Sequence, residues 1–183
     1  RVLPAIELVK HITDVLNVDA GIDYRQRTLT QATVYHTPND SAADEKLKKI
    51  FHDLAGASQG HSIHINHRDI KARAFAGRVV WFDYDALCGT ARSQNDYLEL
   101  IKQFDTIMVS NVPELAPAMF SSARRFTWLI DVMYDHKTKV FISAETVPEA
   151  LYTEGQISNE FFRTVSRLTE MQSQEYLEAP VLE

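Results

Sequence analysis

Apolar side chains recur at the spacing of an α-helix in residues 124–135. The positions that carry this stripe are Phe126, Leu129, Ile130 and Met133. Because positions i, i+3, i+4 and i+7 share one face of a helix, the pattern predicts an amphipathic helix. Residues 139–144 are mostly apolar and end in small and polar side chains, which predicts a buried strand. A helix that leads into such a strand is typical of the second half of a nucleotide-handling α/β unit.

The same periodicity predicts three further helices, over residues 3–16, 41–55 and 159–177. A capping-box pattern at Ser41 opens the second of these helices, and Gly56 closes it. Residues 30–36 alternate enough between apolar and polar side chains to predict a short strand.

Strand patterns dominate the middle of the chain. Residues 62–65, 70–75 and 79–84 predict three strands joined by short polar turns, as in an antiparallel meander. A short helix around 98–104 and a buried strand at 106–110 follow. Because strands that alternate with helices need crossover connections, this part predicts a parallel sheet. The expected fold class is α/β: a three-layer parallel-sheet segment, the antiparallel meander and flanking helices.

Residues 57–60, with the sequence Ala-Ser-Gln-Gly, predict a flexible connection and the best domain boundary. The expected division is a helical segment over 1–57 and an α/β domain with a terminal helix over 58–183.

Composition narrows the class of protein. The 183 residues are 45% hydrophobic and 24% charged, which is typical of a soluble globular protein. The net charge of −6 argues against a protein that grips a nucleic-acid backbone over a broad basic surface. No apolar run reaches the roughly 18–20 residues of a membrane span, and the single cysteine cannot form an internal disulfide. We therefore expect a protein of the cytoplasm, or of an organelle after processing, without a nucleic-acid partner.

Several spaced blocks of the sequence resemble the ZapE family, which are AAA+-type ATPases of bacterial cell division with relatives in mitochondria. The blocks, in the family's order, are 1–6 (RVLPAI), 21–25 (GIDYR), 87–97 (LCGTARSQNDY), 123–145, 147–152 (VPEALY) and 163–177. The resemblance extends over nearly the whole chain. It implies ATP and Mg²⁺ as cofactors of the complete polypeptide, self-association, and a divisome partner, FtsZ, at the division site.

One departure from the family is decisive, because no G-x-x-x-x-G-K-[ST] motif occurs anywhere in the chain. In the resembled family the P-loop lies upstream of the first block, and this chain starts at Arg1, not at methionine. We therefore expect a C-terminal portion, in which 1–57 is a lid-like segment that follows the missing ATPase core. ATP and Mg²⁺ would be bound mainly by the missing N-terminal part, and this fragment alone would be inactive.

Residues 79–144 copy the element order of a P-loop core in degenerate form. The loop 88–95 has one glycine and no lysine, so its backbone cannot wrap a triphosphate. The next strand ends in Ser110 and Asn111, where a metal-binding acid would be expected. We interpret this segment as a degenerate nucleotide-binding-like lobe that serves as a scaffold or binds a partner. An antiparallel arrangement of its strands would contradict this interpretation.

Five arginines are the candidate site residues. Arg124 and Arg125 include a candidate arginine finger, because a guanidinium can stabilise charge on a transferring phosphoryl group. Cations in a helix's first turn oppose the helix dipole, which favours a functional role over two solvated cations at a helix start. Neighbouring residues of a helix face different ways, so at most one of the two should be critical.

Arg163 and Arg167 lie four residues apart on one face of the last helix, where an AAA+ lid would hold a nucleotide-sensing arginine. A solvated face, paired with Glu160 and Glu170, explains them equally well. Arg25, which follows a glycine turn, is a further candidate for nucleotide or interface contact, with a surface ion pair as the alternative.

Two other groups favour ordinary structural roles. His61, His64 and His67 could supply a zinc site, but strand geometry places His64 on the face opposite the other two. We therefore expect no metal site. Cys88 lacks a catalytic signature and is expected to be a small buried hydrophobe.

The leading hypothesis is a C-terminal part of an AAA+-type ATPase in bacterial cell division. Two alternatives stay open: a non-catalytic interaction module that acts as an adaptor, and a mitochondrial relative in protein quality control.

Overall fold

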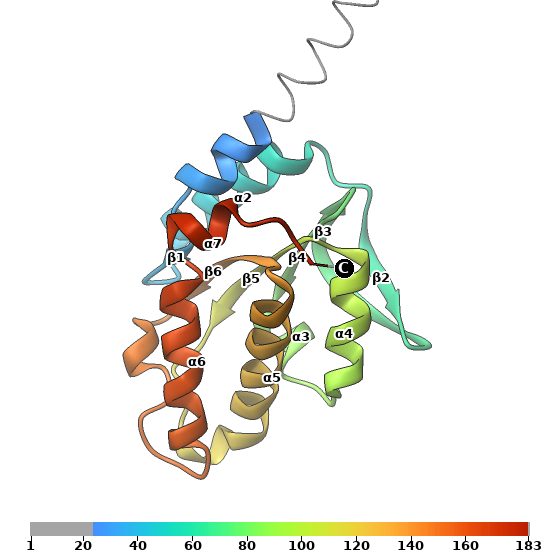
Figure 1. The fold of residues 1–183 in the computed structure, drawn as a ribbon. Coiled ribbons are helices and arrows are strands. Elements are labelled where there is room, and N and C mark those ends of the chain that lie inside the picture. Colours follow the sequence, from blue (N-terminus) through green and yellow to red (C-terminus); the bar gives the residue numbers. More distant parts are fainter. Residues whose placement is uncertain (1–23, 183) are drawn as a thin grey trace, which may run out of the picture.

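A computed structural model describes residues 24–182 of the chain (Figure 1). The predicted helix at 3–16 lies outside these residues. A helix over residues 24–31 is the first described element, so the strand predicted over 30–36 is reduced to β1 (Tyr35–His36).

A six-stranded mixed sheet forms the centre of the molecule, in the order β1-β6-β5-β4-β3-β2. The other strands are β2 (Gly60–Ile65), β3 (Arg68–Ala76), β4 (Val79–Asp83), β5 (Thr106–Val112) and β6 (Lys139–Ala144). β1, β6, β5 and β4 are parallel to one another, whereas β3 and β2 continue the sheet as antiparallel strands. The predicted α/β class, the parallel order of 79–144 and the antiparallel meander are therefore confirmed.

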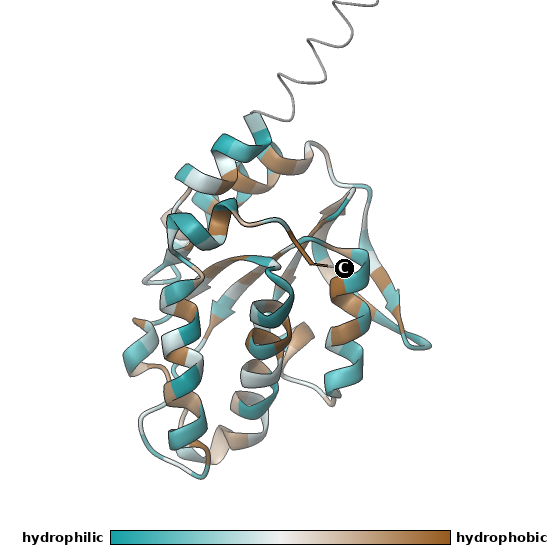
Figure 2. Ribbon diagram, viewed as in Figure 1, coloured by the Kyte–Doolittle hydropathy of each residue, from teal (hydrophilic) through white to brown (hydrophobic). Residues whose placement is uncertain are grey.

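Helices cover both faces of this sheet (Figure 1). α4 (Gln94–Gln103), α5 (Phe120–His136) and α6 (Ser158–Glu170) lie side by side, with α5 between the other two. α2 (Ser41–Ala55) packs on the opposite face, where the Phe51 ring meets Trp81 of β4 at 6.2 Å between centroids. The buried residues of these helices are mostly apolar, and the ribbon colouring in Figure 2 shows hydrophobic and hydrophilic residues alternating along each helix. The predicted three layers are present.

Local side-chain chemistry sets the helix ends. The N-cap of α2 is Asp40, whose carboxylate accepts a 2.9 Å hydrogen bond from the Ala43 amide, so the helix is capped one residue before the predicted Ser41. The predicted helix 159–177 is interrupted after α6. Ser173 caps a separate short helix, α7 (Gln174–Glu178), by accepting from the Tyr176 amide. A serine that bonds to the backbone in this way competes with continuation of a helix.

The start of α5 also differs from its prediction. A 3₁₀ turn, η1 (Pro117–Met119), leads directly into the helix at Phe120, four residues earlier than expected. Arg124 and Arg125 therefore lie in the second turn, where the helix dipole is weak, and the argument from an unfavourable first-turn charge does not apply.

The described part of the chain has one hydrophobic core, which includes residues from α2 and from every helix of the opposite face. β1 and α2 come before the predicted boundary at 57/58, yet β1 pairs with β6 and α2 packs on β4 and β6. The division into 1–57 and 58–183 stays a prediction. Between residues 24 and 182, no helix is long and apolar enough to cross a membrane.

Candidate functional site

The loop between β4 and α4 stands where a P-loop protein would hold phosphate, and side chains of this chain occupy it. α3 (Tyr84–Leu87) follows β4 directly, and its last carbonyl groups accept hydrogen bonds from three side chains. The pairs are Arg92 to Ala86 at 2.9 Å, Tyr97 to Leu87 at 2.8 Å and Arg125 to Cys88 at 2.7 Å.

A β-carbon added at Gly89, the loop's one glycine, would lie 2.7 Å from the Asp85 carbonyl oxygen. The loop is folded tightly onto α3.

The N-terminus of α4, which could otherwise bind an anion, is already capped. Ser93 accepts from the Asp96 amide, and the Asp96 carboxylate accepts from the Ser93 amide, which completes a capping box. Burial opposes ionisation of Asp96, but hydrogen bonds from Asn66 and the Ser93 backbone, with the charges of Arg68 and Arg92, lower its pKa below the ordinary value. A buried carboxylate at this position repels a phosphate.

The carboxyl edge of the neighbouring strands holds an amide in place of the metal-binding acid. Asn111, at the end of β5, adopts a left-handed backbone with φ of 64°. Its side-chain amide donates to Asp83 at 3.1 Å, its side-chain oxygen accepts from Asn39 at 3.0 Å, and its backbone amide donates to Ser143. The adjacent Asp83 faces the Arg73 guanidinium at 3.6 Å.

Arg124 and Arg125, which the sequence could not separate, have different surroundings. Arg125 is half-buried and donates to the Cys88 carbonyl, so its guanidinium holds α3 to α5. Arg124 is also half-buried, but within the described chain no hydrogen bond or ion pair engages its side chain.

Arg163 and Arg167 both face Asp131 of α5. Arg163 donates to one carboxylate oxygen at 3.1 Å and Arg167 to the other. The Arg167 guanidinium also lies 4.9 Å from the centre of the Tyr134 ring, and the Tyr134 hydroxyl donates to Glu170. Side-chain exposure is 18% for Asp131, 23% for Arg167 and 56% for Arg163. This cluster ties α6 to α5, and its partner is Asp131 instead of the predicted Glu160 and Glu170.

The remaining candidates are dispersed. Arg25 is exposed on the helix 24–31, far in sequence from the other arginines. His64 pairs with Asp69 at 2.9 Å, and His61 bonds to the Arg73 carbonyl. In residues 24–182 no group of three or more His, Cys, Asp or Glu side chains could hold a metal ion. Cys88 is fully buried, and burial raises the pKa of its thiol to about 12, so it is a buried hydrophobe as predicted.

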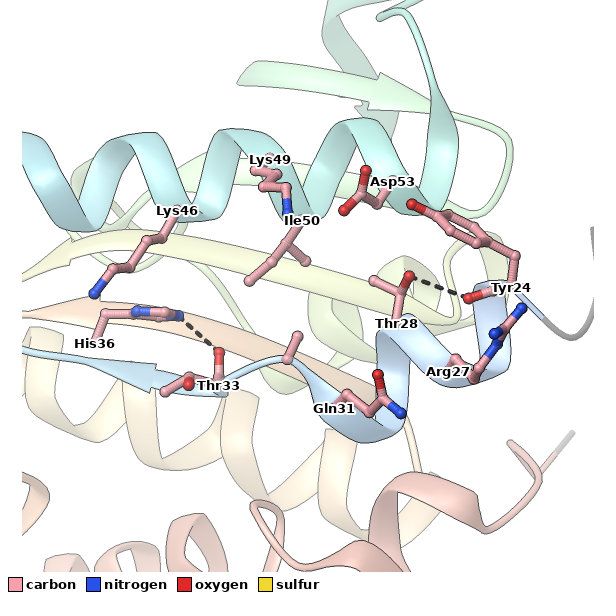
Figure 3. A pocket seen from close by; sticks show the side chains of 11 residues that line it. Tyr24, Arg27, Thr28, Gln31, Thr33, His36, Lys46, Lys49, Ile50 and Asp53 are labelled. Carbon is pink, nitrogen blue, oxygen red and sulfur yellow. Dashed lines mark hydrogen bonds between the residues drawn. The ribbon is translucent and has the colours of Figure 1, made fainter.

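A cavity of about 410 Å³ opens between the helix 24–31, β1 and α2 (Figure 3). Three cations line it, and Figure 3 shows that they come from two elements: Arg27 from the first helix, Lys46 and Lys49 from α2. His36 forms part of the floor, and its Nε2 lies 2.7 Å from the Thr33 carbonyl oxygen. Burial, together with the charge of Lys46, lowers the pKa of His36, so its ring is neutral at pH 7.

Comparison of the sequence with known proteins shows the family to which the chain belongs. The model of the AFG1-like ATPases matches residues 1–180, almost the entire chain. This chain belongs to the AFG1-like ATPase family. Among its relatives, Escherichia coli "Cell division protein ZapE" is 41% identical over 179 residues, which are 97% of this chain and 48% of that protein. Danio rerio "Lactation elevated protein 1 homolog B" is 28% identical, over 95% of this chain and 42% of that protein.

The chain thus spans about half the length of the curated relatives it matches. No solved structure matches it. The spaced sequence blocks indicate this same family, whereas none of the candidate site residues lies in the cationic cavity of this AFG1-like chain. The signal that could have found it is the spacing of Lys46 and Lys49, which places both on one face of α2.

Proposed function

We propose that this chain is the C-terminal part of an AAA+-type ATPase that acts in bacterial cell division. The family match over residues 1–180 and the printed name of the Escherichia coli relative support this function. In the proposed enzyme the complete polypeptide binds MgATP and hydrolyses it, while this part contributes arginines and a partner surface. The partner is FtsZ or another protein of the division machinery, at the division site in the cytoplasm.

One observation carries the proposed division of labour: the capped β4–α4 loop. The backbone amides of Ser93 and Asp96 already donate within the capping box, and the lowered pKa of Asp96 favours its ionised carboxylate. A triphosphate needs free backbone amides and a lysine at this position. Phosphate chemistry is therefore assigned to the P-loop that the family carries upstream, and this chain alone is inactive.

Arg124 is the better candidate for an arginine finger than Arg125. An arginine finger must reach a phosphate bound by a neighbouring subunit. This requires a guanidinium that forms no hydrogen bond or ion pair within its own chain. Arg125 donates to the Cys88 carbonyl, whereas the described residues engage Arg124 in no hydrogen bond or ion pair. Arg163, Arg167 and Arg25 are second candidates, as nucleotide sensors.

The test is steady-state ATP hydrolysis by the complete polypeptide and by its Arg124→Ala and Arg125→Lys variants, with this chain alone alongside. We expect turnover by the complete polypeptide and none by this chain. Arg124→Ala should lower kcat on the order of a thousandfold, with little change in thermal stability. Arg125→Lys should change kcat only in proportion to any loss of folded protein.

Two results would contradict the proposal. MgATP hydrolysis by this chain alone would mean that a site within it is functional. Unchanged kcat in Arg124→Ala, with a large loss in a correctly folded Arg125→Lys, would reverse the assignment of the two arginines.

A further inference from the structure

We propose that the cavity between the helix 24–31, β1 and α2 binds a small anion with two or more linked phosphate groups. The inference is separate from the proposed ATPase, because the cavity lies on the opposite side of the sheet from α5 and α6 and uses none of the five arginines named above.

The cavity lining is positively charged, although the whole chain is negatively charged. Its lining includes Arg27, Lys46 and Lys49 as cations and Asp53 as the one acid, whereas the chain carries a net charge of −6. In the described part of the chain, none of the three cations forms an ion pair. A surface hollow that cations line in excess over acids raises the local concentration of anions.

The three cations are spread along the cavity. In Figure 3 the Lys46 ammonium lies near His36 at one end, Lys49 lies at the middle of α2, and Arg27 lies at the other end, on the helix 24–31. Thr28, Gln31 and Thr33 add polar groups from the opposite wall. Lysine is a common phosphate ligand because its ammonium donates up to three hydrogen bonds.

The size of the space favours linked phosphates over a single one. A second hollow of about 310 Å³ continues past Lys46, and the two share Thr33, His36 and Lys46. The far end of this second hollow is bounded by the Asp40 carboxylate, which caps α2 and repels an anion. We therefore place the phosphates beside Lys46 and Lys49 in the first cavity, whose lining does not include Asp40.

Isothermal titration of inorganic tripolyphosphate into the 183-residue chain at low salt tests the proposal. One variant, Lys46→Gln with Lys49→Gln, removes two cavity charges and keeps most of each side chain. The matched control, Lys48→Gln with Lys71→Gln, removes two exposed lysines that do not line the cavity, so the net charge of both variants is equal.

We expect saturable binding with one site per chain. The cavity variant should bind at least tenfold more weakly than the parent chain, and the control less than threefold, because Lys48 and Lys71 do not line the cavity and act on the anion only through screened solvent. An equal loss in both variants would overturn the proposal and indicate attraction by overall charge. The absence of saturable binding to the parent chain would overturn it as well, and neither result would bear on ATP hydrolysis by the complete polypeptide.

Discussion

The two arginines of α6 and the two lysines of α2 each share one face of a helix, but the fold pairs the arginines with an acid and leaves the lysines beside a cavity. Arg163 and Arg167 are four residues apart, and both meet the carboxylate of Asp131. Lys46 and Lys49 are three apart and meet an open cavity without an ion-pair partner in the described chain. Spacing on a helix shows that charges share a face. Whether they are free to bind a ligand depends on what packs across from them.

The partner of the arginines comes from elsewhere in the chain. Asp131 lies 32 and 36 residues before them and reaches them only because α5 and α6 pack side by side. The cluster is therefore a tertiary contact that holds two helices together. The cavity, by contrast, is an open space between the helix 24–31, α2 and β1.

The largest expected effect comes from removing the shared carboxylate. Asp131→Ala leaves two guanidinium groups without their acceptor, one of them only 23% exposed, and should lower the free energy of unfolding by about 2–3 kcal/mol. Urea unfolding measures this change. The control, Asp135→Ala on the exposed side of the same helix, should change stability by less than about 0.5 kcal/mol. Equal effects would show that Asp131 does not satisfy the arginines.

Lys139 is a third kind of cation, because it is buried and its ammonium donates to backbone carbonyl groups instead of a carboxylate. Lys139 is 3% exposed and donates to the Tyr176 and Ala179 carbonyls at 2.8 and 2.7 Å. Burial, with the nearby Lys137 charge, lowers its pKa to about 8. Between this pKa and the ordinary value of 10.5 the unfolded chain binds more protons than the folded chain, so the contribution of Lys139 to stability rises with pH.

We therefore expect the stability difference between the parent chain and Lys139→Met to shift in favour of the parent by about 2 kcal/mol from pH 7.5 to pH 10. Urea unfolding of both proteins at each pH measures it. A difference that stays constant, or moves the other way, would mean that the Lys139 side chain is not desolvated.

The capping box gives a smaller effect. Ser93→Ala removes the side-chain acceptor for the Asp96 amide and should destabilise the chain by about 1 kcal/mol, as measured by thermal unfolding. Ser93→Asp, which can cap the same amide, is the control and should retain most of the stability. If phosphate ions raised the Tm of Ser93→Ala but not of the parent, the α4 N-terminus would be an anion site held closed by its cap.

The smallest effect is expected at the exposed member of the arginine pair. Arg163→Ala should cost no more than about 0.5 kcal/mol, because Arg163 is 56% exposed and Arg167 keeps its bond to Asp131. A loss of 2 kcal/mol or more in chemical unfolding would show that the two arginines act as one unit.

Much of the fold follows from local patterns in the sequence. The apolar stripe from Phe126 to Met133 predicts α5, and the apolar run at 139–144 predicts β6. In the structure the stripe of α5 and all residues of β6 are buried. The errors fall where local chemistry or a neighbouring element decides. Examples are the early start of α5 at Phe120, the break at Ser173, and the helix 24–31, which includes residues 30 and 31 of a predicted strand.

The candidate site was less predictable, since its properties depend on partners distant in sequence. No local signal shows that Arg125 bonds to Cys88, 37 residues earlier, or that Asp131 engages both arginines of α6. The spacing of Lys46 and Lys49 does not distinguish a binding site by itself, because a helix face with two lysines is usually only a solvated face. The gap that makes them a candidate site comes from the packing of α2 against the first helix and β1.

An NMR titration tests most directly whether the cations of the cavity, and not the arginine cluster or the capped loop, bind phosphate in this chain. ¹⁵N-labelled protein is titrated with tripolyphosphate, and backbone amide shifts are followed. We expect saturable shifts at Thr33, Lys46 and Lys49, with residues 88–96 and Arg163 to Arg167 unaffected. Saturable shifts confined to residues 88–96 or to the α5–α6 arginines, with none around the cavity, would contradict it.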